Sequence, residues 1–147
     1  MDHPIEELAA VAVDHGLSVH RQLGPGLLES VYEMVLMTRL ARAGFRVDRQ
    51  KPVSFECDGL IFPDAFRVDI VIEDRLIIEV KSVEIVANVH VKQLLTYLRL
   101  TGRPLGLLMN FGAATFREGL RRVVNDHQDF ASSRLRVHNP APPVASR

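Results

Sequence analysis

The fold is decided by the stretch Arg67-Val68-Asp69-Ile70-Val71-Ile72, the turn Glu73-Asp74 and the stretch Leu76-Ile77-Ile78-Glu79-Val80-Lys81. Both stretches are rich in β-branched residues, and the short turn makes them antiparallel neighbours. Alternation along the first strand predicts one apolar face, made by Phe66, Val68, Ile70 and Ile72. Asp69 and Glu79 are then able to meet on one face. Two close carboxylates repel and are costly to bury, and a bound divalent cation relieves both costs. The alternative is a buried salt bridge without catalytic meaning, either Glu79–Lys81 or Asp69–Arg67.

The composition indicates one domain of an ordinary globular protein. We expect the domain to cover residues 1–130 of 147, followed by a partly disordered extension over 131–147. Lys+Arg and Asp+Glu are both 18, so no global positive field favours tight nonspecific binding of nucleic acid. The single cysteine, Cys57, excludes an internal disulfide and fits a reducing compartment. The acidic N-terminus lacks a signal-peptide pattern, and no apolar run approaches the ~20 residues that span a bilayer. We therefore expect a cytoplasmic protein without a membrane segment.

Periodicity and turn residues predict the order α-α-β-β-β-α-β-α. The expected helices are residues 4–22, 27–43, 87–100 and 115–125, and the expected strands are residues 46–57, 60–72, 76–83 and 105–111. Asp58-Gly59 is a strong hairpin signal between the first two strands, and Pro63 predicts an irregularity in the middle strand. The continuously apolar fourth strand follows a helix, which favours parallel pairing with an earlier strand. The fold class is therefore α/β (α+β), with a mixed sheet flanked by helices.

Two further segments complete a recognisable pattern. Gly26-Leu27-Leu28-Glu29-Ser30-Val31-Tyr32 has the form GxxExxY, and Gln93-Leu94-Leu95-Thr96-Tyr97 lies on the helix after the Glu79-Val80-Lys81 strand. With Asp69 in the preceding strand, these segments stand in an order that resembles the GxxExxY family, a small branch of the PD-(D/E)xK nuclease superfamily. The resemblance covers residues 20–124. It implies a restriction-endonuclease-like fold.

The resemblance also implies a role for each matching residue. The implied metal ligands are three acids and one backbone carbonyl: Glu29, Asp69, Glu79 and Val80. Hard oxygen donors of this kind suit Mg²⁺ or Mn²⁺. Lys81 matches the lysine that orients or deprotonates the attacking water, and it could act either as a base or as a positive charge. Gln93 and Tyr97 match an element that steadies the active site or touches the substrate strand. Asp64 completes a literal Pro63-Asp64 pair, but the surrounding spacing favours Asp69.

The leading hypothesis is a metal-dependent nuclease that hydrolyses phosphodiester bonds in DNA. The alternative is a non-catalytic module on the same fold that binds nucleic acid or mediates oligomerisation, because fold alone does not establish activity. A third possibility is a nuclease that acts on RNA or on a nucleotide. Cleavage of both strands of a duplex would need two active sites, which a homodimer would supply.

Overall fold

The two strands that carry the candidate acids lie in the middle of a mixed sheet in the computed structural model, which describes residues 2–126 and 135–138. β1 (Val47–Cys57), β2 (Leu60–Ile72) and β3 (Leu76–Lys81) follow one another in antiparallel pairs. Asp58 and Gly59 connect the first pair with positive φ angles of 51° and 80°. These angles match the turns that fit the right-handed twist of a β-hairpin. The hairpin predicted at Asp58-Gly59 is therefore confirmed.

A helical crossover brings the next strand back beside β3. α3 (Asn88–Thr101) ends at Gly102, which has the left-handed conformation common after a helix. β4 (Leu105–Asn110) then pairs in parallel with β3, and all six of its residues are buried. β5 (Leu120–Val124) pairs antiparallel with β4, and β6 (Leu135–His138) pairs antiparallel with β1. The sheet order is β5-β4-β3-β2-β1-β6.

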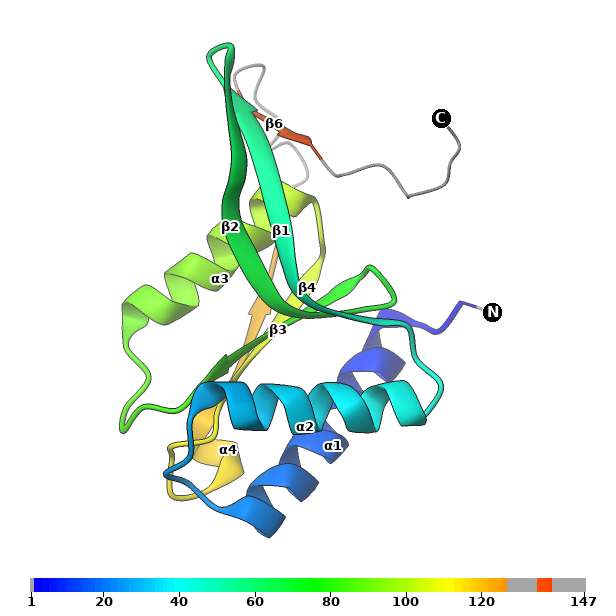
Figure 1. Cartoon of the computed structure of the whole chain (residues 1–147), viewed down its shortest axis with the longest axis vertical. Helices are drawn as coiled ribbons and strands as arrows, with labels where there is room; N and C mark the ends of the chain where they lie inside the picture. Colours follow the sequence, from blue (N-terminus) through cyan, green and yellow to red (C-terminus); the bar gives the residue numbers. More distant parts are fainter. Residues whose placement is uncertain (1, 127–134, 139–147) are drawn as a thin grey trace.

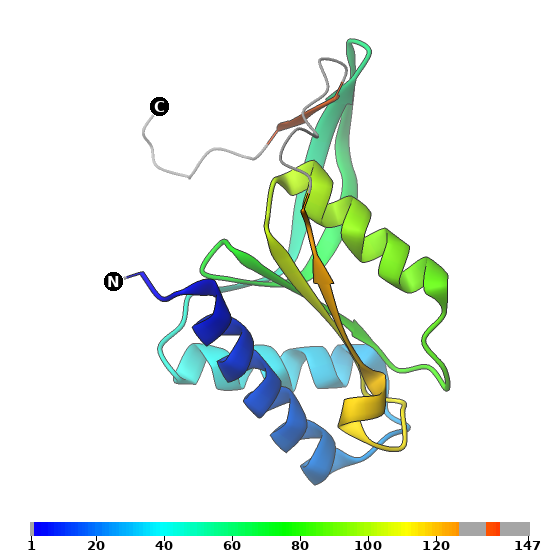
Figure 2. The same ribbon diagram turned by 180° about the vertical axis from the view of Figure 1, so that it is seen from behind.

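Helices cover both faces of this sheet (Figures 1 and 2). α1 (Ile5–Leu23) and α2 (Glu29–Arg42) pack on one face, and α3 packs on the other. The core under α1 and α2 includes Leu8, Tyr32, Leu36, Leu40, Ile70, Ile78 and Met109. The core under α3 includes Val68, Val71, Ile77, Leu94, Leu98 and Leu108. The predicted mixed sheet flanked by helices, with elements in the order α-α-β-β-β-α-β-α, is confirmed, and two strands follow it.

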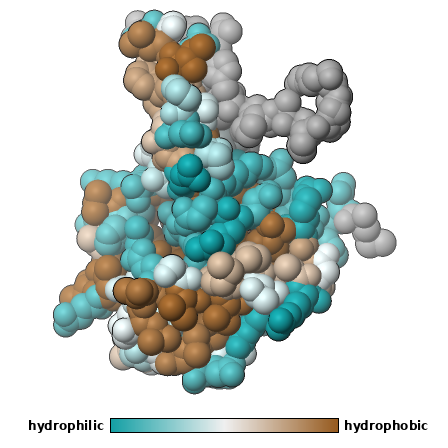
Figure 3. Space-filling model, in the orientation of Figure 1, coloured by the Kyte–Doolittle hydropathy of each residue, from teal (hydrophilic) through white to brown (hydrophobic). Residues whose placement is uncertain are grey.

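The β1–β2 hairpin extends beyond the rest of the fold (Figure 1). Its register changes between the pairs Val53–Phe66 and Phe55–Phe62, so β2 has three residues where β1 has one. The predicted irregularity at Pro63 is thereby confirmed. Near the tip, three hydrophobic side chains are exposed, namely Leu60, Ile61 and Phe62. Figure 3 shows hydrophobic residues at this tip and again on the lower part of the molecule.

The prediction of a last helix over residues 115–125 is wrong beyond the first turn of that helix. α4 comprises only Phe116–Gly119, and the chain continues directly as β5. A Cβ atom at Gly119 would lie 2.2 Å from the Asn110 carbonyl oxygen, so only glycine allows the chain to pass this close to β4. Pairing with the edge of β4 satisfies backbone groups that a short, largely exposed helix would leave in water, and this tertiary gain outweighs the helical pattern.

The predicted face of β2 is also wrong in part. Phe66 and Val68 pack on the α3 side, whereas Ile70 and Ile72 pack on the side of α1 and α2. The change of face occurs at Asp69, across the hairpin from Gln50, whose φ of 54° is left-handed. β1 changes face at the same level, since Val47 packs on the side of α1 and α2 and Val53 on the α3 side, so the strict alternation that the prediction assumed does not hold across this point of the hairpin.

The predicted extension over 131–147 includes β6, and the remainder of it lies outside the described residues. In the part of the chain that the structure describes, no helix combines the length and the apolar character needed to cross a bilayer.

Candidate active site

Asp69 and Glu79 meet where the β2–β3 ladder ends. The last ladder pair on this side is Ile70–Ile78. Beyond it, the Asp69 N–H donates a hydrogen bond of 2.9 Å to Glu79 Oε2, and the Val80 N–H donates one of 2.8 Å to Asp69 Oδ2. Each carboxylate thus accepts the backbone hydrogen bond that the ladder no longer makes. The expectation that these two acids come together is confirmed.

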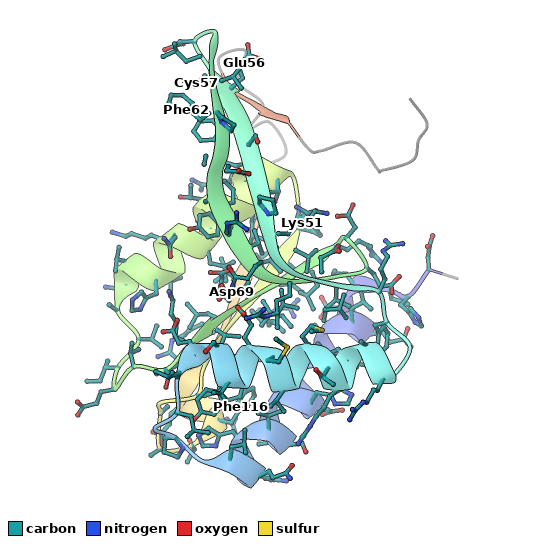
Figure 4. The ribbon with its side chains drawn as sticks, viewed as in Figure 1. Lys51, Glu56, Cys57, Phe62, Asp69 and Phe116 are labelled. Atoms are coloured by element: carbon teal, nitrogen blue, oxygen red, sulfur yellow. The ribbon has the colours of Figure 1, made fainter. Side chains whose placement is uncertain are left out.

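Figure 4 shows Asp69 at the base of the long hairpin, above α2 in that view, and far from Phe62 near the tip. Glu79 is only 6% exposed. Burial is the largest influence on its carboxyl, and together with the charge of Asp69 it raises the pKa of Glu79 from 4.5 to about 8. Burial also raises the pKa of Asp69, although the Val80 N–H, the Gln50 amide and the Lys81 charge oppose this. This pair, one acid buried and the other half-buried, therefore favours binding of a proton or of another cation.

Lys81 lies two residues after Glu79 on β3, so the two side chains share a face of the strand. Its positive charge lowers the pKa of both Asp69 and Glu79 against the effect of burial. Among the described residues, no ion pair joins Glu79 to Lys81 or Asp69 to Arg67. The alternative of a simple buried salt bridge is therefore not supported. Lys81 is half-buried, which leaves part of its side chain accessible.

Glu33 is a third acid at this place, and the sequence prediction missed it. It is 4% exposed, and burial followed by the charge of Asp69 raises its pKa. Gln50 Nε2 donates to both acids, at 2.7 Å to Glu33 Oε1 and 3.1 Å to Asp69 Oδ1. Arg49 forms an ion pair with Glu33, with 2.7 Å between Nε and Oε2.

A signal for Glu33 was present in the sequence. It follows Glu29 by four residues, which places the two acids on the same face of one helix. Gln50 had no comparable signal, because its position depends on the register of the hairpin.

Glu29 is the first residue of α2 and is exposed. Its Oε2 accepts a hydrogen bond of 3.2 Å from the Ser82 N–H, directly after Lys81. The Ser82 hydroxyl donates to the Leu27 carbonyl oxygen at 2.6 Å. These bonds attach the start of α2 to the end of β3, so Glu29 lies beside the lysine end of the candidate site.

The two predicted residues on α3 differ in their surroundings. Tyr97 stacks on Phe66 with ring centroids 4.1 Å apart. Burial, followed by the charges of Glu79 and Asp69, raises the pKa of the Tyr97 hydroxyl. The hydroxyl thus lies within electrostatic range of both acids. Gln93 lies one turn earlier on the helix and is exposed.

The donor set fits a hard divalent cation held by few protein ligands. Within the described ranges, no three side chains of His, Cys, Asp or Glu stand together as a metal-binding group. Mg²⁺ characteristically binds through one or two carboxylates and keeps several waters. Asp69 and Glu79 are two such carboxylates, and Val80, whose backbone carbonyl is the other expected donor on β3, lies between Glu79 and Lys81. The chemistry of these donors is therefore compatible with Mg²⁺ or Mn²⁺.

Comparison with known proteins gives one match. Neither the search of curated proteins nor the search of solved structures found a similar protein. A family model described as the PD-(D/E)XK nuclease superfamily matches residues 6–123. This range includes all the candidate site residues and most of the chain. The chain therefore belongs to the PD-(D/E)XK nuclease superfamily.

Proposed function

We propose that this protein is a metal-dependent nuclease that hydrolyses phosphodiester bonds in DNA. The observation that carries the proposal is the Asp69–Glu79 pair beside Lys81, with Glu79 buried and Asp69 half-buried, on adjoining strands of a chain that belongs to a nuclease superfamily. Neighbouring acids with raised pKa values are typical of sites that bind cations or transfer protons. A nuclease needs such a site to place a cation against a phosphate.

Asp69, Glu79 and the Val80 carbonyl are the groups that would hold Mg²⁺ or Mn²⁺, with Glu29 contributing through a water molecule. When bound, such an ion supplies a more acidic water and positive charge for the phosphate. The Lys81 ammonium would donate a hydrogen bond to the attacking water or to a phosphate oxygen, and it could also act as the base after losing a proton.

Tyr97 and Gln93, on α3, would contact the substrate strand or steady the site. The raised pKa of Tyr97 keeps its hydroxyl protonated, so it can donate a hydrogen bond to a phosphate oxygen. Gln93 is exposed one turn away, where its amide is free to reach a strand lying along the helix.

We also propose that the chain belongs to the GxxExxY branch. In support, Glu29 begins α2, and Tyr32 is fully buried with its hydroxyl bonded to the loop before that helix. The glutamate and the tyrosine of the motif thus have distinct tasks, one at the site and one in the core.

A reducing, cytoplasmic location and a homodimer complete the proposal. The single Cys57 supports the location. The exposed hydrophobic tip of the hairpin, made by Leu60, Ile61 and Phe62, supports association with a second copy. Light scattering on wild type and on Phe62→Ser measures this association, which the substitution should weaken.

The test of the proposed activity compares two aspartate variants. Purified protein is incubated with single-stranded DNA, double-stranded DNA and RNA in the presence of Mg²⁺ or Mn²⁺. Asp69→Asn should lower the rate of hydrolysis by at least about 100-fold, because it removes a carboxylate charge at the reacting centre. Asp64→Asn is the matched control: Asp64 is an exposed residue of the hairpin, with a positive φ that asparagine tolerates. It should retain wild-type activity.

Equal activity in wild type and Asp69→Asn would refute the assignment. If wild type binds nucleic acid without hydrolysing any of the three substrates, the non-catalytic binding module is the correct function. Hydrolysis of RNA alone would correct the substrate class.

A further inference from the structure

Gln50 has a backbone conformation that a residue with a side chain rarely adopts. It lies inside β1, yet its φ is 54°. In this left-handed region a Cβ atom crowds the backbone, so the conformation persists only where surrounding contacts hold it. Such residues gather at functional sites, which directs attention to the contacts of this side chain.

The Gln50 amide joins two acids from different elements. Its Nε2 donates at 2.7 Å to Glu33 on α2 and at 3.1 Å to Asp69 on β2. An amide nitrogen carries two hydrogens, so these two bonds use its full donor capacity. Because Asp69 Oδ2 accepts from the Val80 N–H and Asp69 Oδ1 from Gln50, both oxygens of this carboxylate are oriented.

The left-handed conformation explains how two consecutive residues reach one carboxylate. In a regular strand, Arg49 and Gln50 would point to opposite faces of the sheet. Here Arg49 is paired with Glu33 Oε2 and Gln50 with Glu33 Oε1. The interruption of the strand thus gives the buried Glu33 two partners, and it aligns the Gln50 amide with Asp69.

We propose that Gln50 is a positioning residue of the active site, which orients the Asp69 carboxylate for the cation and couples it through Glu33 to α2. This inference rests on the proposed function. It assigns a role to a residue on a strand that carries none of the superfamily's motif residues. Partners that orient a metal ligand typically change metal affinity by about 10–100-fold when they are removed.

The decisive variant is Gln50→Gly, because glycine accepts a φ of 54° without crowding and removes the side chain that carries the amide. Asp64→Gly is the matched control, since Asp64 has a φ of 52° in the neighbouring strand and an exposed side chain. Mn²⁺ affinity is measured by calorimetry on both variants and on wild type, together with kcat and KM for DNA hydrolysis. We expect Gln50→Gly to bind Mn²⁺ about 10–100-fold more weakly and to lower kcat, whereas Asp64→Gly should match wild type. Wild-type affinity and kcat in Gln50→Gly would overturn the proposal, whatever its melting temperature.

A second measurement works without metal and does not require Gln50→Gly to fold. In wild-type protein with EDTA, the side-chain NH₂ signals of Gln50 in a ¹⁵N-correlated NMR spectrum should exchange slowly with water and should shift in both Asp69→Asn and Glu33→Gln. Rapid exchange, or signals unaffected by both substitutions, would overturn the proposed orientation of Asp69. If wild type neither binds Mn²⁺ nor hydrolyses nucleic acid while these signals behave as expected, the proposed function has failed and the positioning of Asp69 by Gln50 stands.

Discussion

Glu79→Gln removes the most strongly perturbed carboxyl of the site while keeping the size of the side chain. The variant therefore allows us to measure how much folding stability is lost when this carboxyl ionises. The folded pKa of Glu79 is about 8, against 4.5 for the ordinary group, chiefly because the side chain is buried. Between these two values the folded protein holds a proton that the unfolded chain has released. Stability must therefore fall as the pH rises through this window, and the loss is complete above the folded pKa.

The size of this effect follows from the pKa difference. Each pH unit inside the window changes the free energy of unfolding by about 1.4 kcal/mol for one proton. From 4.5 to about 8, a single carboxyl thus contributes at most about 5 kcal/mol, with Asp69 sharing the proton and reducing this figure. Between about pH 5 and about pH 8 we expect the free energy of unfolding of wild type to fall by several kcal/mol, and that of Glu79→Gln not to show this fall.

The assay is urea unfolding followed by circular dichroism across this pH range in the presence of EDTA. Glu84→Gln, an exposed carboxyl shortly after β3, serves as the control and should follow wild type. Adding Mg²⁺ at the upper end of the range should restore stability to wild type, because a cation favours the charged carboxylates. If the free energy of unfolding changed with pH by the same amount in wild type and Glu79→Gln, the reasoning would be refuted, since the loss of stability would then not come from ionisation of Glu79.

Three further substitutions probe the lysine and the framework around the site. Lys81→Met should reduce hydrolysis by about 10²–10⁴-fold without weakening Mn²⁺ binding, because the charge removed is positive; loss of Mn²⁺ binding in calorimetry would contradict this. Gly112→Ala would place a Cβ atom 2.3 Å from the Val83 carbonyl oxygen and should destabilise the protein by about 1–3 kcal/mol, seen as a lower melting temperature. Tyr32→Phe removes a hydroxyl that donates to the Gly24 carbonyl and accepts from the Leu27 N–H, and should cost about 1–3 kcal/mol; an unchanged melting temperature would exclude a stabilising role for these bonds.

Local patterns in the sequence were sufficient for most of the fold. The apolar run directly after Asp69, the turn that follows this run and the apolar run before Lys81 determine the pairing of β2 with β3, because each depends on neighbouring residues. The helix crossover and the parallel β4 followed from the same kind of pattern. Asp69 and Glu79 were predicted to meet for this reason, and they do.

The predictions failed where distant residues decide the outcome. β5 forms because Gly119 permits close approach to Asn110, which no local pattern in residues 115–125 encodes. The hairpin changes faces at the left-handed Gln50, whose amide bonds to an acid on α2 and to another on β2, and no local pattern in the strand indicates these distant partners. The spacing of Glu33 from Glu29 on one helix face was a signal, but the contacts that join Glu33 to the site come from Arg49 and Gln50, which are far along the chain.

The register change in the hairpin separates two registers that the same sequence could adopt. If the tip register of Phe55–Phe62 continued along the intact β2, Gln50 would lie opposite Arg67 instead of Asp69. A cation would then take the place of a carboxylate at the active site, although no residue of the chain had changed. This slip is by two residues, so it would leave every side chain of β2 on its own face, and the hydrophobic pattern alone does not prevent it. Deletion of two residues between Phe62 and Phe66 would instead let the tip register continue directly into the base register, with Gln50 still opposite Asp69.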